Sequence, residues 1–204
     1  GRIYDIHPLT LEDIVNTNQR PKFEEDDHYQ VHIMKMVYEE ECAKKGNDIF
    51  VSEQLTILLM NKNTVISFQE ADGGDVFDII RTRIRQGKGI IRRSGADYLA
   101  YCLIDAVVDS YFVVLERFGD AMEKMEDSLV GNPKQEIIRK LHDLKRQLIF
   151  LRKAVWPMRD MVNNIERSES DLITPATFVY LRDAQDHIAR VIDTVETYRD
   201  LLSG

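Results

Sequence analysis

The stretch TPATFVYLRDAQDHIARVIDTVETYRDLL, residues 174–202, decides the fold of this chain. Its apolar residues recur in alternating steps of three and four, which is the spacing of a helix that packs lengthwise against other helices. They are Leu181, Ala184, Ile188, Val191, Val195, Tyr198 and Leu202. Thr174 suits the N-cap of such a helix and Pro175 its first position. The pattern is still running where the sequence stops, so we expect a longer parent protein.

The composition bounds the class of protein. The chain has 204 residues, 44% of them hydrophobic, which is enough for one large domain or two small ones. Its net charge of −8 disfavours a general role in binding polyanions and suits soluble cations or basic partners. Cys42 and Cys102 lie far apart without a CxxC pattern, so neither a disulfide framework nor a thiolate zinc site is indicated. No signal-peptide pattern opens the sequence, and we expect a reducing cytosol.

Residues 1–93 predict a small sheet with short helices. Runs of β-branched and aromatic residues predict strands over 29–38, 49–60 and 64–69, and the turn NKN makes the last two antiparallel neighbours. Residues 19–27 are expected to form a polar turn. One helix is expected over 6–17, with Leu9, Leu11 and Ile14 facing inward, and another from Asp75 to the glycines of QGKG, with Val76, Ile79, Ile80 and Ile84 as its apolar stripe.

Residues 94–204 predict long antiparallel helices. The run YLAYCLIDAVVDSYFVVL, residues 98–115, is apolar enough to require a membrane check. Each of its two aspartates would cost about 2.5–3.5 kcal/mol near the middle of a span, so we expect a buried core helix instead. The next helix is expected to begin near Pro133 and to kink at Pro157. Its seam comprises Ile137, Leu141, Leu144, Leu148, Leu151, Val155, Met158, Val162 and Ile165.

Acidic side chains on these apolar helices are the best chemical signal. Asp105 and Asp109 share a helix face, and a buried carboxylate needs a cation, a donor or a proton. A salt bridge is a commoner solution than a metal ion. The same holds for Asp183, Asp186 and His187, whose commoner role is a solvated helix face. Carboxylate oxygens suit magnesium, whereas the imidazole would admit zinc or cobalt.

Other charged patterns, and the search for catalytic motifs, give less information about function. The basic residues Arg81, Arg83, Arg85, Lys88, Arg92 and Arg93 would suit anionic lipid or nucleic acid, but a solvated helix face followed by a loop explains them equally well. The sequence has no glycine-rich phosphate loop, no GxSxG and no HExxH motif. We therefore expect no enzyme. A metallohydrolase would require a convergent histidine set, and a helical scaffold without metal remains an alternative.

Three blocks, in this order, resemble the CorA magnesium transporter family almost end to end. They are IHPLTLEDIVNTNQRPK, FQEADGGDVFDIIRTRIRQGKGIIRRSGADYLAYCLIDAVVDSYF and LRDAQDHIARVIDTVETYRDLLSG. The resemblance implies an α+β cytoplasmic domain in which a small mixed, partly antiparallel sheet is sandwiched by helices. Residues 1–93 would be the C-terminal part of that α/β domain, and residues 94–204 the long-helix funnel that ends in the start of a stalk helix.

The resemblance also implies metal sites between protomers of a homopentamer. Asp13 in LEDI and Asp183 in LRDAQDH resemble the two opposed carboxylates of the family's first regulatory site. Glu12, Asp105 in LIDA and His187 resemble contributors to the second site. Bound Mg²⁺, with Co²⁺ or Zn²⁺ as other candidates, would hold the subunits together and keep the transporter closed.

Several features of the family have no counterpart in this sequence. The transmembrane helices, the GMN loop and the strands expected upstream of IHPLTLEDI are missing. We expect the chain itself to be soluble, unable to conduct ions, and joined in its full-length parent to the cytoplasmic side of the cell membrane. Related ZntB-type zinc transporters share the architecture, so a zinc transporter stays an alternative to a magnesium and cobalt transporter.

Overall fold

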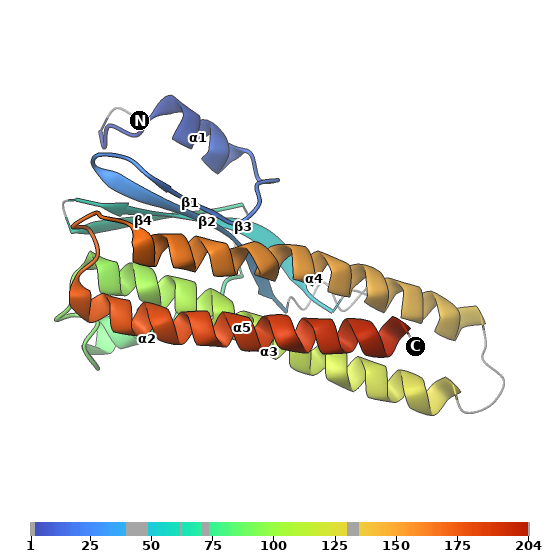
Figure 1. Cartoon of the computed structure of the whole chain (residues 1–204). Coiled ribbons are helices and arrows are strands. Elements are labelled where there is room, and N and C mark those ends of the chain that lie inside the picture. The colour runs from blue at the N-terminus through green and yellow to red at the C-terminus, as the bar shows by residue number, and fades with distance from the viewer. Residues whose placement is uncertain (1–2, 40–48, 62, 71–73, 130–134, 204) are drawn as a thin grey trace.

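The computed structural model describes residues 3–39, 49–61, 63–70, 74–129 and 135–203. The chain begins with the short helix α1 (Pro8–Val15), followed by β1 (Lys22–Glu25), β2 (Tyr29–Tyr38), β3 (Val51–Met60) and β4 (Thr64–Gln69). A second short helix, α2 (Asp78–Gln86), precedes the three long helices α3 (Ala96–Leu129), α4 (Gln135–Arg167) and α5 (Pro175–Ser203). Figure 1 shows the three long helices side by side beneath the sheet, with α1 on its opposite face.

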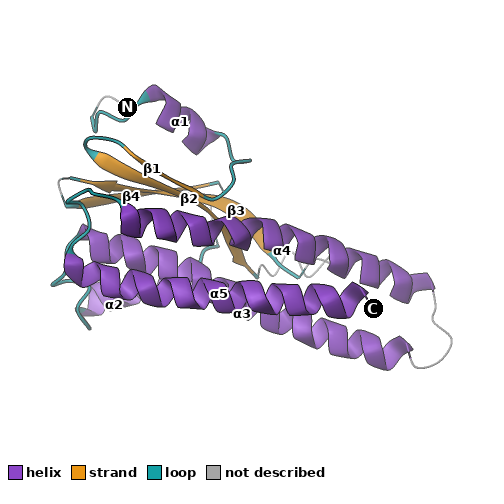
Figure 2. Cartoon of the chain, viewed as in Figure 1, coloured by secondary structure: helices purple, strands orange, loops and turns teal. Residues whose placement is uncertain are grey.

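The strands form one sheet in the order β1-β2-β3-β4, and each of the three pairings is antiparallel. Figure 2 shows this layer of strands with helices on both of its faces, so the expected α+β sandwich is confirmed. No parallel pair of a mixed sheet occurs among the described strands. The tight turn between β3 and β4 is also confirmed, because Met60 pairs with Thr64.

Strand β1 corrects the sequence prediction, which gave a polar turn over residues 19–27. Lys22–Glu25 instead pairs with Gln30–Ile33 of β2. Three of its four residues are charged, which suits an edge strand whose outer side must not pair with another chain. Charge on an edge strand removes the alternating apolar pattern by which strands are recognised.

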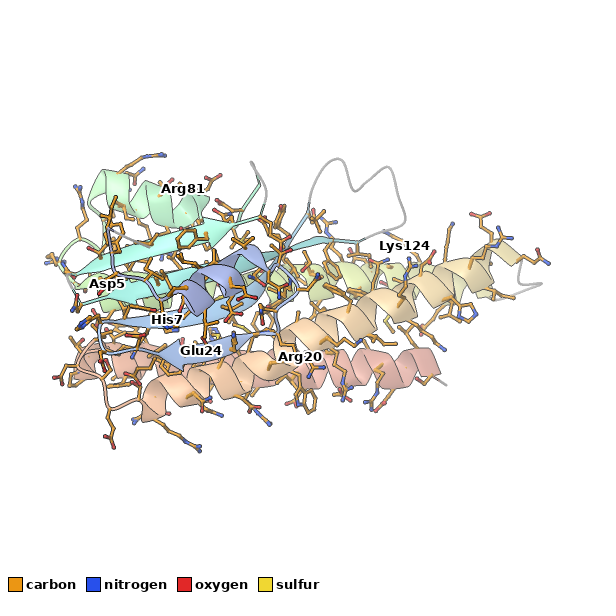
Figure 3. The ribbon with its side chains drawn as sticks, turned by 90° about the horizontal axis from the view of Figure 1, so that it is seen from above. Asp5, His7, Arg20, Glu24, Arg81 and Lys124 are labelled. Atoms are coloured by element: carbon orange, nitrogen blue, oxygen red, sulfur yellow. The ribbon has the colours of Figure 1, made fainter. Side chains whose placement is uncertain are left out.

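Two apolar cores lie on the two faces of the sheet. The smaller core joins α1 to the sheet through Tyr29, Val31, Ile33 and Leu58, with Leu11 and Ile14 packed against it; viewed from above, α1 lies over the strands (Figure 3). Leu9 was predicted to face inward, but it is 64% exposed. The helix instead buries Thr10, whose hydroxyl lies 3.1 Å from the Tyr29 hydroxyl.

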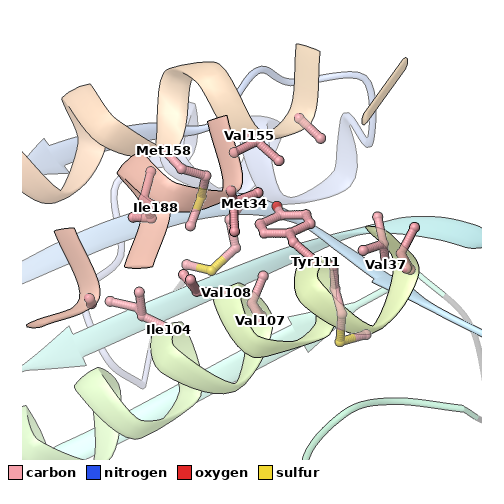
Figure 4. Close-up of a cluster of buried hydrophobic side chains, with 14 of the residues drawn as sticks. Met34, Val37, Ile104, Val107, Val108, Tyr111, Val155, Met158 and Ile188 are labelled. Carbon is pink, nitrogen blue, oxygen red and sulfur yellow. The ribbon is translucent and has the colours of Figure 1, made fainter. Parts of the chain in front are cut away.

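The larger core lies between the sheet and the long helices. Figure 4 shows α3 presenting Ile104, Val107, Val108 and Tyr111 towards Met34 of β2 and towards Ile188 of α5. Within the described residues, Ala96–Glu126 is the one helical segment with the length and apolar composition of a membrane span, and 61% of its most apolar window is buried. This burial is typical of a core helix, as the sequence predicted.

Both predicted helical seams are confirmed. On α4 the seam residues from Leu144 to Ile165 are buried, and on α5 all seam residues are buried except Tyr198, which is partly buried. Helix α2 ends as expected at Gly87, which adopts the left-handed conformation with φ 63°. Ile79 of the same helix is 57% exposed, which corrects its predicted inward position; the short α2 buries Ile80 instead.

Candidate metal centre

The beginnings of α3 and α5 are fastened together by one carboxylate. Asp97 in the first turn of α3 accepts hydrogen bonds at Oδ2 from the backbone N of Thr174 (3.0 Å), Thr174 Oγ1 (2.7 Å) and Thr177 Oγ1 (2.7 Å). Burial alone would raise the pKa of Asp97, but these hydrogen bonds outweigh it and lower the pKa below its usual value. Asp97 thereby fixes the position of α5 against α3.

A group of potential metal ligands lies along this fixed pair of helices. Asp105 and Asp109 on α3 and His187 on α5 each offer one ligand atom, and these atoms lie within 4.8 Å of one another. The ring of Phe112 meets the His187 ring edge-on at 6.1 Å between centroids. Two carboxylates and one imidazole beside an aromatic wall form a mixed oxygen and nitrogen ligand set for a divalent cation.

Two atoms in this group are buried and have no hydrogen-bond partner within the described part of the chain: Asp105 Oδ1 and His187 Nδ1. Burial raises the pKa of Asp105, and the negative charge of Asp109 raises it further. A hydrogen bond from Tyr101 and the proximity of His187 act in the opposite direction but do not restore the usual pKa. Because buried polar atoms are nearly always satisfied, this pair fits a group that binds a cation.

Asp183 lies at the edge of the same group. Its Oδ2 is 3.6 Å from Nε2 of His187, one helical turn away, and its side chain is 62% exposed. Its charge also contributes to the raised pKa of Asp105. The structure therefore brings together three of the five predicted site residues, Asp105, Asp183 and His187, while Asp186 remains exposed.

Asp13 and Glu12 do not join this group within one chain. Both lie on α1, which the sheet separates from α3 and α5 (Figure 1). Asp13 accepts hydrogen bonds from Lys22 Nζ and Gln19 Nε2, each at 2.7 Å, whereas Glu12 is exposed. Any contact between Asp13 and Asp183 must therefore be made between two copies of the chain.

The structure adds two residues that the predicted ligand set omitted. Asp109 was recognised as sharing a face with Asp105 but was not assigned to the site, although its spacing of four residues was the available signal. Tyr101 hydrogen bonds to Asp105, and a tyrosine on an apolar helix gives no such signal in the sequence.

The remaining candidates lie outside this group. In the basic stretch, Arg81 pairs with Asp75 and Asp78, and the other five basic residues are exposed. Cys102 is a buried free thiol whose pKa burial raises to about 11, and Cys42 lies outside the described residues. Neither feature adds a ligand to the centre.

The comparison with known families decides the relationship. The model of the CorA-like Mg²⁺ transporter protein family matches residues 1–204. The chain belongs to this family. The resemblance in the sequence is thereby confirmed, and the family is one of transporters. The chain is 45% identical over 204 residues to the cobalt/magnesium transport protein CorA of Thermotoga maritima, covering 100% of the chain and 56% of that protein. It is 23% identical over 185 residues to the protein of the same name in Methanocaldococcus jannaschii, covering 90% and 56%.

Solved structures agree on the fold. The soluble domain of CorA from Methanocaldococcus jannaschii superposes with a TM-score of 0.81 at 23% identity, covering 97% of this chain and 76% of that chain. The ZntB cytoplasmic domain from Vibrio parahaemolyticus gives a TM-score of 0.78 at 18% identity, covering 98% and 75%. At these identities the likeness concerns the fold alone. The chain spans little more than half the length of the CorA proteins named above.

Proposed function

We propose that this chain is the cytoplasmic regulatory part of a CorA-type magnesium and cobalt transporter in the cell membrane, and that divalent cations bound between protomers stabilise its closed pentamer. Support comes from the family and from the relatives named as cobalt/magnesium transport proteins. The observation that carries the sensing function is the pair of buried atoms without partners, Asp105 Oδ1 and His187 Nδ1, beside Asp109.

The placement of the acids suggests how binding would couple to assembly. Asp13 and Glu12 on α1 would face Asp183, Asp105 and His187 of a neighbouring copy, because the sheet separates these two sets within one chain. Without a cation, the facing carboxylates repel each other. A bound Mg²⁺ would replace repulsion by attraction, so ion binding and subunit contact would strengthen each other reciprocally.

The two parts of the chain would have different roles in the transporter. Residues 1–93 would supply α1 and the sheet as the α/β part, and residues 94–204 would supply the funnel helices. Helix α5 carries both Asp183 and His187 and is a continuous helix of 29 residues. A change at these ligands would therefore reach the end of α5, where the stalk of the full-length transporter would continue into the membrane.

Zinc is the second candidate ion, as in a ZntB-like transporter. The observation in its favour is His187, because imidazole nitrogen suits zinc better than it suits magnesium. A helical scaffold without metal sensing is the remaining alternative, and it predicts that neither ion nor chelator changes the assembly.

Sedimentation velocity tests the proposal. The chain and its full-length transporter are measured with Mg²⁺, with Zn²⁺ and with chelator, as wild type and with Asp13→Ala, Asp183→Ala or both. We expect Mg²⁺ to favour the larger species in wild type and each substitution to weaken that effect. Glu123→Ala, an exposed acid on α3, is the matched control and should behave as wild type. Mg²⁺-dependent assembly that persists in the double variant would contradict the intersubunit sensor.

A further inference from the structure

A second feature of the molecule lies apart from the acidic centre. Between the middle of α4 and the sheet there is an open cleft of about 870 Å³, which we call the basic cleft. Its walls come from the segment Thr17–Pro21 after α1, from Lys35 of β2, from Ser52 of β3 and from residues 150–157 of α4. Figure 3 shows Arg20 beside the middle of α4.

The charge of this cleft is opposite to that of the chain. Among the described residues, Arg20, Lys35, Arg152 and Lys153 line it together with one carboxylate, Glu70, whereas the whole chain has a net charge of −8. Four cations gathered in one concavity of an acidic protein repel each other, and an anion in the cleft would relieve that repulsion.

Existing ion pairs neutralise only two of the four cations. Lys35 Nζ lies 3.7 Å from Glu70 Oε1, and Arg152 Nε donates to Glu196 Oε1 at 2.6 Å. Arg20 and Lys153 are exposed and form no ion pair with any residue that the structure describes. The cleft therefore offers two uncompensated cations from two different elements, the loop after α1 and helix α4.

The polar surroundings match a phosphate group better than a lone carboxylate. Ser52 lines the cleft, and its hydroxyl oxygen is buried with no hydrogen-bond partner among the residues that the structure describes. Guanidinium and ammonium groups bind phosphate oxygens strongly, and a chain of phosphates can reach cations on separate elements at once. The cleft volume lies in the range of small-molecule binding sites.

An aromatic residue lies next to the cations. Trp156 lines the cleft, is 37% exposed, and has the guanidinium carbon of Arg152 at 4.8 Å from its ring centroid. It is the only tryptophan of the chain. A ligand that binds Arg152 or Lys153 would change the surroundings of this indole, so its fluorescence reports on the cleft directly.

We propose that the basic cleft binds a di- or triphosphate group, held by Arg20 and Lys153 with Lys35 and Arg152 beside them. The group has two sources of the same chemistry: the phosphate tail of a nucleotide, and inorganic polyphosphate. The cleft shares no residue with the acidic centre, although Gln19, which lines it, donates a hydrogen bond to Asp13.

Tryptophan fluorescence, with equilibrium dialysis as a second measurement, tests this proposal on the whole chain in buffer containing chelator. ATP, tripolyphosphate and adenosine are titrated separately. We expect saturable binding of ATP and of tripolyphosphate and none of adenosine. Tighter binding of ATP than of tripolyphosphate would identify a nucleotide as the preferred source, and equal binding would identify the phosphate chain alone.

Charge reversals locate the site. Arg20→Glu and Lys153→Glu should each weaken tripolyphosphate binding about tenfold or more, because each replaces a charge-assisted contact by repulsion. Arg139→Glu changes the same charge at an exposed position of α4 outside the cleft and should leave binding near wild type. Asp105→Asn should also bind normally, which separates this proposal from the metal sensor. Equal weakening by Arg139→Glu, or absence of saturable binding, would overturn the proposal.

Discussion

Asp13 on α1 and Asp105 on α3 were both predicted as metal ligands, yet the surroundings of their carboxylates in the folded chain are opposite. Asp13 is paired with Lys22 and Gln19 at 2.7 Å each. Asp105 has one buried oxygen without a partner, lies beside a second carboxylate, and has a raised pKa. The first carboxylate is already satisfied inside its own chain, whereas the second carries an electrostatic cost that the folded chain does not offset.

The difference separates two kinds of ligand. A carboxylate with a lysine partner must exchange that partner for an ion, so its contribution to binding is the difference between two favourable states. A carboxylate that is buried and repelled gains the full benefit of an arriving cation. We therefore expect α3 and α5 to hold the ion in a single chain, and α1 to contribute when a neighbouring copy is present.

The largest effect on stability comes from protonation of His32. In any pH experiment this effect must be distinguished from the titration of the metal centre. His32 is 1% exposed, neither ring nitrogen has a hydrogen-bond partner in the described ranges, and burial lowers its pKa to about 4. Between pH 6.5 and 4 the unfolded chain binds a proton at His32 that the folded chain does not. Stability should fall by about 3 kcal/mol as pH decreases through this window.

Urea unfolding of wild type and His32→Gln at several pH values measures this effect. In the variant, the free energy of unfolding should depend much less on pH between pH 6.5 and 4. An unchanged slope would assign the acid sensitivity to other groups. Well above pH 6.5 His32 is neutral in both the folded and the unfolded chain, so that range is the appropriate one for comparing Asp13 with Asp105.

Asp97 provides the next largest effect, because it positions α3 against α5. Asp97→Ala removes three hydrogen bonds and leaves the buried Thr177 hydroxyl with Thr174 Oγ1, 3.3 Å away, in place of the carboxylate acceptor. We expect a loss of about 2–3 kcal/mol in the free energy of unfolding. Metal binding should weaken as well, since the ligands on the two helices lose their common anchor. Thr174→Val removes one of the three hydrogen bonds and should show a smaller loss, measured by the same unfolding experiment.

Metal affinity in a single chain tests the comparison directly. Asp105→Asn and His187→Ala should each lower the affinity for Co²⁺ or Mg²⁺ about tenfold or more, since each removes a ligand and its charge or lone pair. Asp13→Asn should change the affinity of the monomeric chain by less than about twofold, because α1 lies across the sheet. Isothermal titration at concentrations that keep the chain monomeric measures both. An equal loss in all three variants would contradict the assignment of the primary ligands to α3 and α5.

The smallest effect has opposite signs at the two carboxylates. Above neutral pH and without metal, Asp105→Asn should stabilise the chain by up to about 1 kcal/mol, after allowance for solvent screening, because it removes a charge that burial and Asp109 disfavour. Asp13→Asn should destabilise it by about 0.5–1 kcal/mol through the weakened pair with Lys22.

The pH dependence provides the check on these signs. The pKa of Asp105 is higher in the folded chain than in the unfolded chain. As pH rises from the unfolded pKa through the folded pKa, the wild-type chain therefore loses stability. The Asp105→Asn variant should not show this loss. Thermal unfolding with chelator, referred to wild type at each pH, measures the effect. Two changes of the same sign would show that the two carboxylates do not differ in the way that their contacts indicate.

The helical framework and most of the strands can be predicted from patterns in the sequence alone. The seams of α4 and α5, the turn between β3 and β4 and the end of α2 at Gly87 follow from contacts within one or two helical turns or between adjacent residues. The family motifs also supplied Asp105, Asp183 and His187 as candidate ligands. These features depend on local patterns or on family motifs, and both can be recognised in a sequence.

Which charged side chains have partners is set by the packing of the folded chain. The pairing of Asp13 with Lys22, the lack of a hydrogen-bond partner for Asp105 Oδ1 among the described residues, the approach of Asp109 to His187 and the gathering of Arg20 with Lys153 all depend on how different elements pack together. The charged edge strand β1 and the outward positions of Leu9 and Ile79 depend on long-range packing in the same way. Periodicity identifies the face of a helix, but the electrostatic cost of a side chain is set by its neighbours from other elements.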